Sequence, residues 1–99
     1  MKNSFIGKYC IIRSDRAGVF AGTVEEHDGQ SVVLRNVRRL WYWDGAASIS
    51  QIAVDGVKEP QNCKFTMAVD TLALFDVIEI IPATEKAREV IEGVEIWKR

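Results

Sequence analysis

The sequence is poor in the residues that most metal and redox sites require. Its 99 residues include one histidine and two cysteines. His27 has no partner at metal-ligand spacing, and Cys10 and Cys63 form no C-x-x-C pair. We therefore expect no metal and no cofactor, and we expect both cysteines to be free thiols, buried like small apolar side chains.

Features typical of catalysis are also scarce. Nucleophilic catalysis requires a Cys or Ser beside a histidine base, whereas His27 stands next to Asp28 in a predicted hairpin turn. The chain has no Walker-type lysine loop and no G-x-G-x-x-G pattern. We expect a protein that is not an enzyme.

Signals for membranes and secretion are missing as well. No apolar run reaches the roughly 20 residues of a membrane span. The N-terminal Met1–Lys8 has no apolar core of the kind found in secretory signals. We expect a cytoplasmic protein without a membrane partner.

What is present is the composition of an ordinary globular domain, with 47% apolar residues, 27% charged residues and a net charge of −1. The length fits a single domain, residues 1–99. A net charge near zero argues against wholesale polyanion binding. Residues 1–50 nevertheless hold seven Lys/Arg against five Asp/Glu, so a local basic surface can form.

Residues 8–43 predict three strands and a tight hairpin. Alternating and β-branched residues place the strands at Lys8–Arg13, Val19–Glu26 and Ser31–Trp43. Asp28-Gly29 lies between two of them and is a strong hairpin signal. Gly22 inside a strand indicates a sharp bend or a close backbone approach. The imperfect alternation of the third strand predicts a bulge near Asn36.

The middle of the chain predicts a short helix followed by two strands. Ser48-x-x-Gln51 is a capping-box pattern, so we expect a helix over residues 48–54. The next strands are expected at Cys63–Val69 and Leu72–Ile81, with a kink at Asp70–Thr71.

The C-terminal part, about 84–99, predicts a helix and a tail. Thr84 can cap a helix over Glu85–Glu92, which Gly93 ends. Ile96 and Trp97 on the tail need a surface to pack on, either this barrel or another subunit. Together the elements predict a mainly β fold with minor α content: a small bent barrel of about five strands, a short inserted helix and a C-terminal helix. Open barrel edges and an apolar tail lead us to expect a homo-oligomer.

The candidate binding site is the cluster Arg38–Trp43 and the turn that follows it. Indole and phenol rings stack on bases, and arginines bind phosphate through forked hydrogen bonds. The small residues before the predicted helix can present N–H groups, with serine hydroxyls as further donors. The candidate ligand-binding residues are Arg38, Arg39, Trp41, Tyr42, Trp43, Ser48, Ser50 and Gln51.

Each part of this site also has a structural interpretation. Aromatic residues are ordinary strand formers, and half of them must face the core. Trp41 and Trp43 share one strand face, and Leu40 and Tyr42 share the other, so we expect one pair in the core and one pair exposed. The turn can be a tight strand-to-helix connection with a serine cap.

One short run resembles the first motif of Sm-like proteins: Phe20-x-Gly22-x-Val24-x-x-x-Asp28, before a strand that ends in Leu34-Arg-Asn-Val37. In that family an Asn a few residues after the Asp helps to bind RNA bases. Here Val32 stands about where that Asn would be, and the Arg-Gly of the second motif is missing from Leu72 to Ile81. The resemblance implies an Sm/SH3-like barrel more than it implies RNA binding.

A longer resemblance covers most of the chain. Arg38-Arg-Leu-Trp-Tyr-Trp43, Gly45-Ala-Ala-Ser-Ile-Ser-Gln-Ile-Ala53 and Asn62-Cys-Lys-Phe65 are similar to a family of small proteins found largely in phage and prophage genomes. This resemblance implies a viral or prophage setting, with the protein in the cytoplasm of the host cell.

The function we predict is a non-catalytic phage module that binds a small anionic ligand and sequesters a nucleotide immune signal, an anti-defence role. Two alternatives stay open. One is an Sm-like RNA-binding regulator, and the other is a protein-interaction module that acts on a host or virion protein, because aromatic residues with arginine also form interface hot spots.

Overall fold

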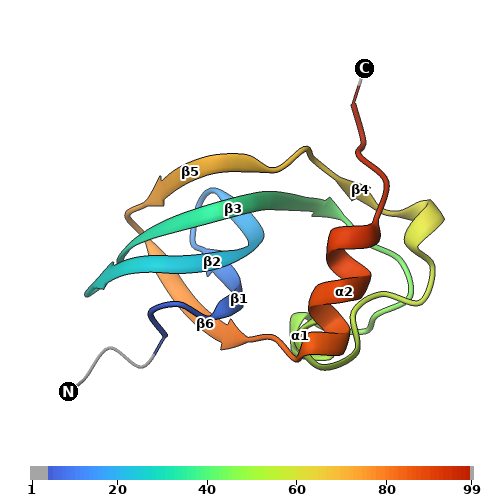
Figure 1. Ribbon diagram of the computed structural model, residues 1–99, viewed down its shortest axis with the longest axis horizontal. Helices are drawn as coiled ribbons and strands as arrows, with labels where there is room; N and C mark the ends of the chain where they lie inside the picture. The colour runs from blue at the N-terminus through green and yellow to red at the C-terminus, as the bar shows by residue number, and fades with distance from the viewer. Residues whose placement is uncertain (1–4, 99) are drawn as a thin grey trace.

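Six antiparallel strands and two α-helices form the described chain, residues 5–98 of a computed structural model (Figure 1). The strands are β1 (Tyr9–Ser14), β2 (Gly18–Asp28), β3 (Ser31–Tyr42), β4 (Lys64–Phe65), β5 (Val69–Leu74) and β6 (Val77–Pro82). The helices are α1 (Ile49–Asp55) and α2 (Glu85–Gly93), and a 3-10 helix covers Pro60–Asn62. The predicted mainly β fold is confirmed. The expectation that Met1–Lys8 is not a secretory signal falls partly on residues 1–4, which lie outside the described residues.

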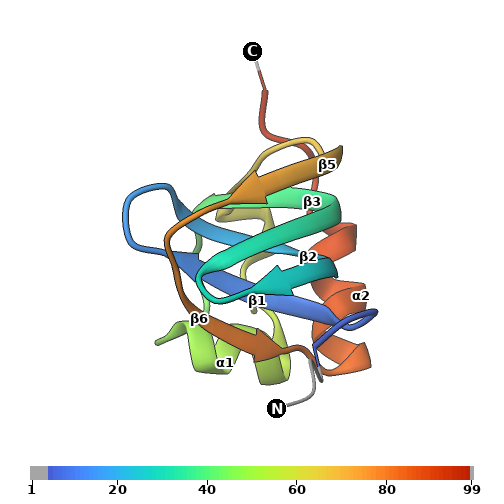
Figure 2. The ribbon, with the colours of Figure 1, turned by 90° about the vertical axis from the view of Figure 1, so that its left-hand side faces the viewer.

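The sheet runs in the order β5-β3-β2-β1-β6, with the short β4 beside the C-terminal end of β3. A two-residue turn, Phe75–Asp76, joins β5 to β6. Figure 2 shows the strands in this order, with the chain passing directly from the β5 edge to the β6 edge. The five long strands therefore curl into a small barrel, as the sequence predicts.

A bulge bends β3 in the middle of the barrel. Asn36 and Val37 both lie opposite Gly22 of β2. Asn36 accommodates the extra residue in the left-handed region, with φ 49°, a conformation that Asn adopts more readily than most residues. The predicted bulge near Asn36 and the predicted close approach at Gly22 are confirmed.

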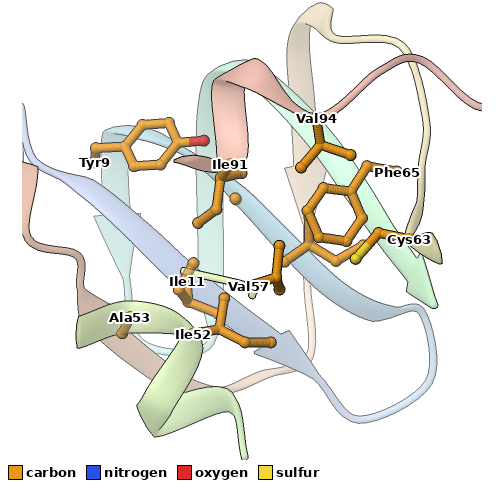
Figure 3. Packing of buried hydrophobic residues seen from close by; sticks show 11 residues of the cluster. Tyr9, Ile11, Ile52, Ala53, Val57, Cys63, Phe65, Ile91 and Val94 are labelled. Carbon is orange, nitrogen blue, oxygen red and sulfur yellow. The ribbon is translucent and has the colours of Figure 1, made fainter. Parts of the chain in front are cut away.

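The centre of the sheet is covered on both faces, which gives the molecule two apolar clusters. Cys10 and Ile12 of β1 belong to the cluster inside the barrel, whereas Tyr9 and Ile11 belong to a second cluster beneath the helices. Figure 3 shows this second cluster, to which α1, the segment around β4 and α2 all contribute side chains. Both cysteines are free and buried, as predicted. Burial raises the pKa of the Cys10 thiol to about 11.

Local capping defines both helices close to their predicted limits. Ser48 caps α1 by accepting a hydrogen bond from the Gln51 N–H, and Gln51 Oε1 accepts one from the Ala47 N–H. Thr84 caps α2 by accepting from the Ala87 N–H. Neither helix within residues 5–98 is long and apolar enough to cross a membrane.

The strand limits predicted between residues 63 and 81 are wrong. The expected strand over residues 63–69 is reduced to the two residues of β4, and the expected strand over residues 72–81 is divided by the turn at Phe75–Asp76. Continuous alternation across Phe75 conceals this turn in the sequence. Asp76 in this turn accepts hydrogen bonds from Ser14 and Arg16, which are distant in sequence but lie beside it at the end of β1.

The close approach at Gly22 yields a stability prediction. In Gly22→Ala, the new β-carbon would lie 2.8 Å from Val37 Cβ and 3.0 Å from Val37 Cα. Because this backbone contact cannot relax easily, we expect a loss of about 1–3 kcal/mol in the free energy of unfolding, measured by urea denaturation. Gly93→Ala is the matched control, since its new β-carbon would have no neighbouring atom within 4 Å. Equal stability of the two variants would contradict the prediction.

Candidate functional site

A cleft of about 360 Å³ lies between the β1–β2 turn and the C-terminal end of β3. We call it the Trp41 cleft, and its eight described lining residues are Arg16, Ala17, Gly18, Val19, Arg39, Leu40, Trp41 and Trp43. They include two arginines and two tryptophans, and none of them is acidic. Three of the predicted site residues, Arg39, Trp41 and Trp43, are thus brought together, and Arg16 joins them.

Arg16 reaches the cleft because its turn is attached to Asp76. The Ser14 hydroxyl donates to one Asp76 oxygen, and the Arg16 backbone N–H donates to the other at 3.1 Å. The hydrogen bond from Ser14 is the main cause that holds the pKa of Asp76 below its usual value. The Arg16 Nε lies 3.5 Å from the same carboxylate, but the side chain is 87% exposed. The turn is therefore fixed, while the guanidinium can turn toward a ligand.

Arg39 is held over the barrel by an aromatic contact. Its guanidinium carbon lies 4.8 Å from the centre of the Phe20 ring, a cation–π distance. Within residues 5–98, no carboxylate oxygen lies within ion-pair distance of Arg39. Its charge is therefore available to an anion in the cleft.

Trp41 is also the centre of an aromatic stack beside the cleft. The Trp41 and Trp97 rings stack with centroids 5.2 Å apart and planes at 16°. Lys64 Nζ lies 5.1 Å from the Trp41 centroid and 5.6 Å from that of Trp97. The Trp97 backbone N–H donates to the Phe65 carbonyl, and Ile96 forms an isolated β-bridge with Phe65. The tail therefore packs on its own barrel.

Burial of the aromatic run differs from the expected alternation. Trp41 is 58% exposed and Tyr42 is 49% exposed, whereas Leu40 is buried and Trp43 is half-buried against the second cluster. We expected one of the pairs Trp41/Trp43 and Leu40/Tyr42 in the core and the other exposed, and this prediction is wrong. The pairing of β3 with β4 shifts register between Leu40 and Tyr42, and β3 ends there, so the alternation stops.

Arg38 points to the opposite face and bonds within the protein. It is 6% exposed and donates to four backbone carbonyls at 2.8–3.1 Å. These carbonyls belong to Phe65, Thr66, Ile91 and Val94. Burial lowers the pKa of Arg38 from its usual value, but an arginine stays charged at neutral pH. Arg38 thus joins β3 to β4 and to the C-terminal end of α2, and we leave it out of the ligand site.

The serine turn is likewise used locally. The side chains of Ser48 and Gln51 make the capping bonds of α1. α1 packs toward α2, β1 and β6, and the residues that line the Trp41 cleft include neither serine. Ser50 lies on the exposed surface of α1. The structure therefore does not join this turn to the cleft.

Sequence reasoning did not select Arg16, Lys64 or Trp97 for the site. For Trp97, the sequence indicated only that this apolar residue of the tail must pack on some surface. His27, the single histidine, lies at the β2–β3 hairpin, 3.0 Å from the Gly29 carbonyl, with its ring against Phe5. Residues 5–98 contain no cluster of three or more His, Cys, Asp or Glu able to hold a metal ion.

Comparisons with known proteins identify the family and the fold. The chain belongs to the family described as a domain of unknown function, DUF6948, whose sequence model matches residues 7–91. Among curated proteins, none matches the sequence. A solved heptameric archaeal Sm protein is similar in structure, with a TM-score of 0.50 and 15% identity over 82% of this chain and 93% of that chain. This likeness confirms the predicted Sm-like fold.

Arg38 yields a prediction that separates it from its neighbour. Arg38→Met removes the donors to four buried carbonyls, and each unpaired buried group costs about 1–3 kcal/mol. We expect a loss of at least about 2 kcal/mol in the free energy of unfolding, measured by urea denaturation. Arg39→Met is the matched control and should change stability by less than about 1 kcal/mol, because Arg39 makes only a cation–π contact. If both variants were equally stable, the joining role of Arg38 would be wrong.

Proposed function

We propose that this member of the family is a non-catalytic binding module for a small anionic ligand of the nucleotide class, held in the Trp41 cleft. One observation carries the proposal: Arg16, Arg39, Trp41 and Trp43 line a single cleft in which none of the lining residues is acidic. An exposed indole face on Trp41, the unpaired charge of Arg39 and the exposed guanidinium of Arg16 are what a ring bearing phosphate needs.

The chemistry divides between the two kinds of side chain. A base can stack on the exposed face of Trp41 and contact Trp43, with a contribution of about 1–3 kcal/mol for each stacked base. The guanidinium groups of Arg16 and Arg39 offer forked hydrogen bonds to phosphate oxygens. The volume of about 360 Å³ lies within the range of small-molecule sites, roughly 300–1,000 Å³.

The Trp41–Trp97 stack prepares the site for binding. Trp97 covers one side of Trp41 and restricts the indole to one orientation, so less rotamer freedom is lost when a ligand stacks on the cleft side. Lys64, above both rings, adds a third positive charge at this end of the molecule. These contacts favour a ligand with more than one phosphate oxygen available.

The biological role we propose is sequestration. A module that binds a nucleotide signal tightly and does not turn it over lowers the concentration of the free signal in proportion to the amount of protein. This fits the phage or prophage setting implied by the Leu40-Trp-Tyr-Trp43 resemblance, in which the signal belongs to host defence.

A thermal-shift screen followed by isothermal titration tests the site, with mono-, di- and cyclic nucleotides and a short RNA. A ligand at about 100 times its Kd adds about 2.7 kcal/mol of stability. Trp41→Ala and Arg39→Gln should each weaken binding about fivefold or more, since about 1.4 kcal/mol corresponds to tenfold and each contact contributes about 1 kcal/mol or more. The matched control is Arg35→Gln, an arginine on the same strand that pairs with Glu25 at 3.2 Å and Asp70 at 3.3 Å.

Each outcome of this screen has a defined meaning. The proposal fails if no nucleotide raises the melting temperature, or if Arg35→Gln weakens binding as much as Arg39→Gln. A shift with RNA alone, with steep salt dependence, would support the second candidate, an RNA-binding regulator, which the Sm-like fold favours. A flat screen would favour a protein partner for the aromatic surface.

Self-association is the second part of the proposal. β5 pairs only with β3, and β6 pairs only with β1, within the described chain, so each leaves one strand edge open. Val69, Phe75 and Ile78 are exposed apolar side chains on or beside these strands. The structurally similar Sm protein is heptameric. We propose that copies of this chain associate through the β5 and β6 edges.

Light scattering over a wide concentration range tests this association. We expect a molar mass that is a multiple of one chain, and we expect the charged variants Phe75→Glu and Ile78→Glu to reduce it by repulsion at the joined edges. Val54→Glu, at an exposed apolar position on α1, is the matched control and should not change the mass. A mass of one chain at every concentration would rule the association out.

A further inference from the structure

A second cavity, of about 200 Å³, lies on the other face of β3, between the bend of the strand and the end of α2. It shares no lining residue with the Trp41 cleft. The residues that define its chemistry are Tyr9, Asn36, Arg38, Glu92, Val94 and Ile96. None of the functions considered above uses it.

The Tyr9 side chain is mostly buried, and its hydroxyl opens onto this cavity. Tyr9 is 6% exposed, and Figure 3 shows its ring extending from β1 with the hydroxyl directed toward α2. Its ring lies against the Arg88 guanidinium, but the hydroxyl has no hydrogen-bond partner among residues 5–98. Burial raises the pKa of Tyr9 well above its usual value, so the group stays protonated. No fully buried side-chain nitrogen or oxygen lacks a partner among residues 5–98, so this hydroxyl is reached by solvent at the cavity and is free to bond a molecule there.

Arg38 and Asn36 bring further donors to the same space. An arginine has five N–H donors, and four of those on Arg38 bind backbone carbonyls. One N–H on Nη2 is left. Asn36 stands in the left-handed conformation at the bulge, φ 49°, and its amide makes no hydrogen bond within the described chain. A left-handed non-glycine residue is uncommon, and here it places an amide at the cavity.

Glu92 supplies an acceptor to the same cavity. Its carboxylate lies 3.4 Å from Arg88 Nε, one turn earlier on α2, and it retains lone pairs for other donors. Val94 and Ile96 add apolar walls. The cavity therefore offers donors, an acceptor and aliphatic surface among its lining residues.

We propose that this cavity binds the hydrogen-bonding edge of a flat, uncharged heterocycle of nucleobase size. An amide or amidine edge carries an acceptor beside an N–H donor in one plane. The acceptor would receive hydrogen bonds from Tyr9 and Arg38, and the N–H would donate to Glu92. The positive charge of Arg38 disfavours a cationic ligand, and the negative charge of Glu92 disfavours an anionic one. The volume lies below the roughly 300 Å³ of drug-sized sites, which limits the ligand to about one ring system.

NMR titration of the amide signals tests this site with uracil, cytosine and adenine as probes. The control probe is 1,3-dimethyluracil, which keeps the ring and the carbonyls but has no N–H donor. We expect saturable shifts at Asn36, Arg38 and Val94 with at least one base and none with the control. Tyr9→Phe should weaken that binding at least tenfold, whereas Trp41→Ala should leave it unchanged.

The melting temperature of Tyr9→Phe tests separately whether the Tyr9 hydroxyl lacks a partner within the protein. Because the hydroxyl has no protein partner to lose, the variant should melt at the same temperature as the parent or higher. A fall of several degrees would show an internal partner and would overturn the proposal. So would the absence of saturable shifts with all three bases, equal binding of 1,3-dimethyluracil, or unchanged affinity in Tyr9→Phe. The proposal does not rest on the function of the Trp41 cleft.

Discussion

At the bend of β3, Val37 lies so close to Gly22 that a β-carbon between them would not fit, and Asn36 takes up the extra residue in the left-handed region. A bulge of one residue exchanges the two faces of a strand. Before it, the even-numbered residues of β3 face the barrel interior, and after it the odd-numbered residues do. This shift directs Arg38 to the helical layer and Arg39 to the Trp41 cleft, so both cavities depend on it.

The helical layer in turn depends on a buried positive charge. Within the described chain, no carboxylate lies within ion-pair distance of Arg38. Instead it binds four carbonyl oxygens, two of them in the last turn of α2 and just after it. Carbonyl groups at the C-terminal end of a helix lack intrahelical partners and carry partial negative charge. One guanidinium thus satisfies the end of α2 and attaches it to the barrel, which closes the second apolar cluster.

The two proposed sites lie on opposite faces of β3. Each is completed by residues from distant parts of the chain. The Trp41 cleft combines β3 with the β1–β2 turn, which Asp76 holds in place. The second cavity combines β3 with β1, α2 and the tail. One strand can support two separate chemistries, because its successive side chains point in opposite directions.

Local features could be predicted from the sequence alone: the hairpin, the bulge, the caps of both helices and the Sm-like barrel. Each depends on neighbours within a few residues or on a short motif. The sequence also marked Arg38 and Arg39 as equal candidates, and it missed the turn at Phe75–Asp76. Only the tertiary structure separated the two arginines and formed that turn. The reason is physical: the hydrogen-bond partners of Arg38 and Asp76 lie 27 or more residues away, so the hydrogen bonds that decide burial exist only after the barrel has formed.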